Sequence, residues 1–123
     1  MMNTNQIIEN LLKLGVEEKA SKLFISLLET GPQTPLSLSR NTNINRTTIY
    51  RELEKLREYG LIEEILEEHT TLFQASDPNS FNLLITRKES EVSQMKSSLP
   101  NLLSQISQIT PIAPNTKVLY YRG

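Results

Sequence analysis

The sequence predicts a mainly α-helical protein in which a winged helix-turn-helix domain with a small β-hairpin is followed by a long C-terminal coiled-coil helix. Two observations predict the winged domain: the early part of the chain has the apolar spacing of short amphipathic helices, and two short runs of β-forming residues follow it. The third observation is a heptad pattern of apolar residues after residue 77, which favours a coiled coil.

The N-terminal segment has the pattern of two amphipathic helices. The first ends at Gly15, because glycine readily adopts the positive φ that closes many helices. The second covers residues 17–30 and is stopped by Gly31 and Pro32. The apolar residues of the first are Ile7, Ile8, Leu11, Leu12 and Leu14, and those of the second are Ala20, Leu23, Phe24, Leu27 and Leu28.

A helix-turn-helix motif is predicted next. Thr34 suits an N-cap and Pro35 the first position of a short helix. Asn43 provides the tight turn, because asparagine tolerates the left-handed conformation better than most residues. Asn45 can then cap a further helix that ends at Gly60.

The second helix of this motif is the element expected to read DNA. We expect Ile49, Leu53 and Leu56 to face inward, which at 100° per residue points Thr47 and Arg51 away from the core. Side chains in the first turns of such a helix reach base edges in the major groove, where arginine can pair bidentately with guanine. The residues expected to bind DNA are Arg46, Thr47, Thr48, Tyr50 and Arg51, with Arg46 and Tyr50 directed at the DNA backbone.

The local charge favours DNA as a partner although the overall charge does not. The chain has 13 basic and 14 acidic residues and a net charge of −1, which argues against a general polyanion binder. Residues 40–57 contain more basic than acidic side chains and are locally positive. An ordinary solvated helix face is the alternative interpretation of the same residues. The basic side chains are Arg40, Arg46, Arg51, Lys55 and Arg57, and the acidic ones are Glu52 and Glu54.

Residues 61–66 and 70–75 predict the hairpin that forms the wing, with Glu67-Glu68-His69 between the two runs. The wing contains several glutamates and neither lysine nor arginine, so we expect it to be structural and to stay away from phosphates. Its glutamates are Glu63, Glu64, Glu67 and Glu68, and its plausible DNA contacts are His69, Thr70 and Thr71.

The heptad pattern predicts a homodimer. Its seam favours self-association over a helix that packs on its own winged domain, which is the alternative interpretation. Lys88 interrupts the seam, and Pro100 predicts a kink or two abutting helices because proline removes a backbone hydrogen bond. The predicted dimerisation residues are Phe81, Ile85, Val92, Met95, Leu99, Leu102, Ile106 and Ile109.

Composition excludes several classes of function. The chain has no cysteine, so it has neither a disulfide nor a thiolate metal site. We find no catalytic arrangement of side chains, and we expect neither an enzyme nor a cofactor. The N-terminus lacks the layout of a signal peptide and no run is long enough to span a bilayer, so we expect a cytoplasmic protein without a membrane partner.

Three stretches resemble the N-terminal part of TrmB-like transcriptional regulators of archaea and bacteria. They are LGVEEKA at 14–20, LLETG at 27–31 and INRTTIYR at 44–51. The resemblance implies duplex DNA binding through Arg46, Thr47, Thr48, Tyr50 and Arg51. It also implies that an effector, often a sugar in that family, would act only through a C-terminal domain absent from this chain. Two features depart from the family pattern: an asparagine, Asn43, where glycine is usual, and the acidic wing.

The expected organisation is a winged domain with its N-terminal helix at 1–76, a dimerisation helix at 77–110, and a tail at 111–123 that includes the strand-like run 116–121. The tail resembles the start of the family's C-terminal domain, which implies a fragment, a naturally short version or a chain cut at a domain boundary. The leading hypothesis is sequence-specific binding of double-stranded DNA by a homodimeric transcriptional regulator. The alternative is a winged-helix module that binds other proteins without binding DNA.

Overall fold

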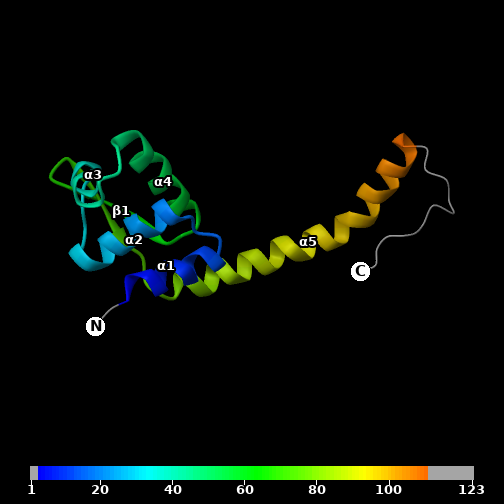
Figure 1. Ribbon diagram of the computed structural model, residues 1–123, viewed down its shortest axis with the longest axis horizontal. Coiled ribbons are helices and arrows are strands. Elements are labelled where there is room, and N and C mark those ends of the chain that lie inside the picture. The colour runs from blue at the N-terminus through cyan, green and yellow to red at the C-terminus, as the bar shows by residue number, and fades with distance from the viewer. Residues whose placement is uncertain (1–2, 111–123) are drawn as a thin grey trace. The chain divides into compact units, whose positions relative to one another are not determined.

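The computed structural model describes residues 3–110 and confirms a mainly helical protein with one β-hairpin (Figure 1). The tail 111–123, with its expected strand-like run, lies outside the described residues. The elements are α1 (Thr4–Lys13), α2 (Glu18–Thr30), α3 (Pro35–Thr42), α4 (Arg46–Glu58), β1 (Ile62–Glu67), β2 (Thr70–Ala75) and α5 (Ser80–Ile109).

The two residues predicted to cap the helices of the helix-turn-helix motif do so. The Thr34 side chain accepts a hydrogen bond from the backbone N–H of Ser37 at 3.1 Å, at the start of α3. The Asn45 side chain accepts one from the N–H of Thr48 at 2.9 Å, at the start of α4. Asn43 has a φ of 64°, which confirms the left-handed turn between the two helices.

The core lies among α1–α4, the hairpin and the first turns of α5. The residues predicted to face inward from α4 are all buried there, which confirms that prediction. The largest fully buried apolar side chains are Leu23, Leu27, Leu38, Ile49, Leu56, Leu61, Leu84 and Val16.

The hairpin is antiparallel, with register pairs that run from Ile62–Ala75 to Glu67–Thr70. Its turn contains two residues, Glu68 and His69, and both have positive φ, as a type I′ turn requires. The sequence pattern predicts Glu67 in the turn, but in the structure Glu67 pairs with Thr70 within the ladder.

Gln33 adds an interaction that the sequence did not predict. Its backbone forms an isolated antiparallel bridge with Phe73, with N–O distances of 3.0 and 2.8 Å. Its buried side-chain amide donates to the carbonyl and hydroxyl oxygens of Ser26 and accepts from Ser37 and Asn41. One residue therefore connects α2, α3 and the wing.

Two residues near the start of α5 belong to the winged domain. Leu84 is buried in its core, and the Phe81 ring packs edge-on against Phe24 with 5.7 Å between ring centroids. Phe81 was predicted to lie in the dimer seam, and the structure places it against α2 instead. The compact unit consequently extends to Thr86 and does not end at Ser76.

The remainder of α5 belongs to a second unit that begins at Arg87. Pro100 lies inside one continuous helix, so the expectation of two abutting helices is wrong. The ribbon changes direction within the yellow-to-orange stretch that contains Pro100, in agreement with the predicted kink (Figure 1). Within residues 3–110, none of the helices combines the length and the apolar character that crossing a membrane requires.

Candidate nucleic-acid interface

The first two turns of α4 present four of the five predicted DNA-binding residues to solvent. Thr47 is exposed and the Arg51 side chain is 61% exposed. Arg46 and Tyr50 are also exposed, and an Arg46 guanidinium nitrogen donates to the Tyr50 hydroxyl at 3.4 Å. This face therefore offers two hydroxyl groups, a methyl group and two guanidinium groups on one helix.

Thr48 is the exception. It is only 7% exposed, which contradicts the expectation that its side chain contacts DNA. The residue follows Thr47 by 100° on the helix, and that rotation turns it toward the buried side next to Ile49. A covered side chain does not reach a base edge unless the domain opens.

A groove of about 530 Å³ lies between the N-terminus of α3, the exposed face of α4 and the wing. Arg46 and Tyr50 line it from α4, and His69, Thr70 and Thr71 line it from the wing. The groove thus brings together the outward face of the helix and the few wing residues for which the sequence suggested DNA contact.

One glutamate of the wing holds the wing against α4. Arg57 Nη1 lies 2.5 Å from Glu64 Oε1, and a second guanidinium nitrogen of Arg57 lies 4.0 Å from Glu54 Oε1. Glu63 accepts a hydrogen bond from Gln74 on the opposite strand at 3.1 Å. Two of the wing's glutamates therefore bind partners within the domain, which the sequence did not indicate.

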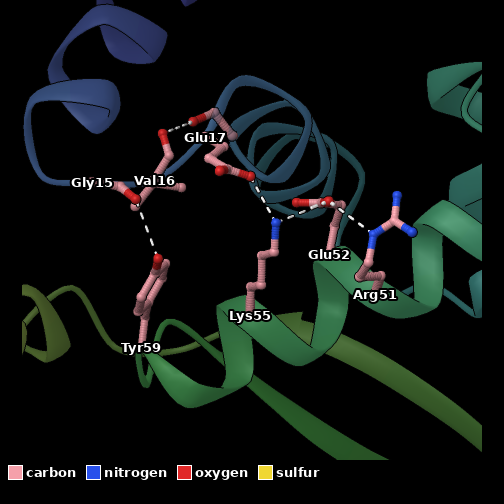
Figure 2. Close-up of polar contacts among 8 residues, drawn as sticks. Gly15, Val16, Glu17, Arg51, Glu52, Lys55 and Tyr59 are labelled. Carbon is pink, nitrogen blue, oxygen red and sulfur yellow. Dashed lines mark hydrogen bonds and ion pairs between the residues drawn. The ribbon is translucent and has the colours of Figure 1, made fainter.

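A chain of ion pairs connects α4 to the start of α2 (Figure 2). Lys55 Nζ lies 2.7 Å from Glu17 Oε1 and 3.5 Å from Glu52 Oε2, and Arg51 Nε lies 3.9 Å from the same oxygen of Glu52. The hydrogen bond from Lys55 lowers the pKa of the Glu17 carboxyl below its ordinary value, and the same bond raises the pKa of Lys55. Sequence reasoning missed Glu52 and Lys55 as a pair, although their i,i+3 spacing on a helix was visible.

The same side of α4 is also attached near its C-terminus. The Tyr59 hydroxyl donates to the carbonyl oxygen of Gly15 at 3.2 Å, beside the start of α2 (Figure 2). Together with the Lys55 pair, this bond attaches the C-terminal half of α4 to the start of α2.

The predicted seam of α5 is the second candidate interface. From Ile85 onward, all of its apolar members are between 40% and 82% exposed in the single chain. These residues are Ile85, Val92, Met95, Leu99, Leu102, Ile106 and Ile109. Exposed apolar rows of this length are unusual on monomeric surfaces and are characteristic of association surfaces.

Comparison with known proteins gives one family and several structural relatives. Residues 11–79 match the model of the family described as sugar-specific transcriptional regulator TrmB. A search of curated protein sequences finds no significant match.

Three solved structures show the same fold. TrmBL2, an archaeal chromatin protein, has a TM-score of 0.69 and 14% identity over 88% of this chain and 42% of its own. A possible transcriptional regulator from Methanosarcina mazei Go1 has a TM-score of 0.58 and 15% identity, over 76% of this chain and 87% of its own. A MarR family transcription regulator has a TM-score of 0.54 and 19% identity, over 86% of this chain and 74% of its own. This chain therefore spans less than half the length of TrmBL2.

Proposed function

The chain belongs to the TrmB family of sugar-specific transcriptional regulators, and we propose that it binds specific sequences of double-stranded DNA as a homodimer. The observation that carries this proposal is the face of α4 on which Thr47 and Arg51 are exposed while Ile49 and Leu53 are buried. A helix held in this way by its domain can enter a major groove without rearrangement.

Each exposed residue has a role that its chemistry suits. Arg51 has the donors to pair with O6 and N7 of a guanine, and the Thr47 methyl group can contact a thymine methyl group. Arg46 and Tyr50 lie near the groove toward the wing, where a guanidinium and a hydroxyl can bind phosphate oxygens. Thr48 has no direct role in this proposal, because it is buried.

The wing is proposed to stay outside the minor groove. Glu67 and Glu68 stand exposed at or beside its turn, where an approaching phosphate would be repelled. His69 and the hydroxyl groups of Thr70 and Thr71 line the groove near the turn and could approach the DNA backbone favourably. Specificity is therefore assigned to α4 alone.

The homodimer is proposed to form along the exposed seam of α5. Burial of these apolar residues against a second copy would remove them from water, and the heptad spacing suits a two-stranded coiled coil. A dimer supplies two recognition helices, so its preferred site should contain two related half-sites.

Selection from a random duplex library tests this proposal. We expect the full chain to enrich one sequence with two half-sites, and we expect its affinity to fall steeply as salt is raised, through the release of counterions from phosphates. Enrichment of no sequence would contradict the proposal. The acidic wing favours a second candidate function, a module that binds other proteins, and that function predicts neither enrichment nor steep salt dependence.

A further inference from the structure

We propose that Glu52 is a positioning residue for the DNA-reading arginine: its buried carboxylate holds Arg51 Nε, so that the two terminal nitrogens of the guanidinium point outward to a base. This inference rests on the proposed function, because it assigns Glu52 a role in how Arg51 discriminates between base pairs.

The first support is the burial of a charged group. Glu52 is 3% exposed, on the side of α4 that packs against α2. Its Oε2 lies near Lys55 and Arg51, whereas its Oε1 is buried without a hydrogen-bond partner among the described residues. A buried carboxylate oxygen without a donor is costly, and an uncharged residue at this place would avoid the cost.

The second support is the anchor on the far side of the carboxylate. Lys55 lies between Glu52 and Glu17, and the Glu17 side chain stands at the start of α2 (Figure 2). The attraction of Lys55 keeps the Glu52 carboxylate from following Arg51 out toward solvent. The Arg51 guanidinium must therefore orient toward the carboxylate, while the carboxylate itself stays in place.

The third support is which nitrogen of Arg51 is used. The shortest ion-pair distance to Glu52 is from Nε, at 3.9 Å, and the terminal nitrogens lie on the side away from the carboxylate (Figure 2). Pairing through Nε leaves both terminal N–H groups free for bidentate contact with guanine O6 and N7. A guanidinium that is already oriented loses less conformational entropy when it binds a base.

The inference makes opposite predictions for affinity and for specificity. Removal of the negative charge of Glu52 should raise affinity for any duplex slightly, because phosphates are then repelled less. Discrimination at the base pair that Arg51 contacts should fall, because the guanidinium is no longer oriented. A residue with only a structural role would change stability and leave this discrimination unchanged.

The experiment is a double-mutant cycle by fluorescence anisotropy, on the duplex selected by the wild-type chain. The base pair read by Arg51 is first identified as the one whose replacement weakens wild-type binding but leaves Arg51→Ala binding unchanged. Affinity for the selected duplex and for the duplex changed at that base pair is then measured for Glu52→Gln. Glu54→Gln is the matched control, because it removes the same charge from the same helix at a residue that pairs with Arg57.

We expect Glu52→Gln to reduce the affinity ratio at that base pair by about 2- to 5-fold, the range of one partly exposed ion pair, and to have no effect on the ratio in the Arg51→Ala background. Glu54→Gln should keep the wild-type ratio. Glu52→Met, an apolar replacement of similar length, should give the same loss and serves if the glutamine variant does not fold. An unchanged ratio in the folded variants would overturn this inference alone, whereas failure of Arg51→Ala to weaken binding would overturn the proposed function as well.

Discussion

The Gln33 side chain offers a direct test of how the wing is attached to the helices. Gln33→Ala removes the four side-chain hydrogen bonds that the amide makes to Ser26, Ser37 and Asn41, and it retains both backbone hydrogen bonds to Phe73. The substitution thus isolates the contribution of the amide from that of the bridge.

The expected magnitude follows from the burial of the partners. Ser26 is buried, so its carbonyl and hydroxyl oxygens lose an N–H donor that water does not easily replace, and such a loss costs about 1–3 kcal/mol. Ser37 and Asn41 are more exposed and can bind water instead. We therefore expect a decrease of about 2 kcal/mol in the free energy of unfolding, which corresponds to a decrease of roughly 10 °C in Tm for a domain of this size.

Thermal unfolding followed by circular dichroism measures this change. Asn41→Ala is the matched control, because it removes one exposed partner of the same amide and should lower Tm by only a few degrees. A Gln33→Ala variant as stable as Asn41→Ala would refute the assignment of Gln33 as the link between α2, α3 and the wing.

Three further predictions concern the helix cap, the ion-pair chain and the seam. Asn45→Ala should lower the free energy of unfolding by about 1 kcal/mol in urea titrations, through loss of the N-cap of α4; an unchanged midpoint would contradict this role. Because the pKa of Glu17 is lowered in the fold, its pair with Lys55 stabilises the domain above the ordinary carboxyl pKa and loses this effect as the pH falls through the lowered value. Lys55→Met should consequently make Tm less sensitive to acid below about pH 4.5, and an equal sensitivity in both proteins would show that the pair contributes nothing. Leu99→Lys should convert the proposed dimer into a monomer in light scattering, whereas Ser98→Lys, off the seam, should not; a dimer that survives Leu99→Lys would place the interface elsewhere.

The helix boundaries could be predicted because their signals are local. Thr34, Asn43 and Asn45 act through hydrogen bonds or backbone angles within a few residues of themselves, so the sequence alone contains the relevant geometry. The inward face of α4 could be predicted equally well, because its apolar residues recur at helical spacing.

What the sequence could not show depends on contacts between distant segments. The helical wheel placed Thr48 beside Thr47, but burial by neighbouring elements decided that only Thr47 is exposed. Phe81 fits the heptad spacing, yet its ring packs on Phe24, because the first turns of α5 complete the core of the winged domain. Glutamate is usually a surface residue, and only the packing of α4 on α2 reveals that Glu52 is buried.

The central claim is that the exposed face of α4 binds the bases of DNA. The affinity of Arg51→Ala and Thr47→Ala for the selected duplex tests this claim most directly. Loss of a bidentate contact to guanine should weaken Arg51→Ala by about 5- to 150-fold, corresponding to about 1–3 kcal/mol, with a smaller effect for Thr47→Ala. Lys22→Ala removes the same charge from α2 and should bind almost as the wild type does. Binding by all three variants at wild-type affinity would contradict the account.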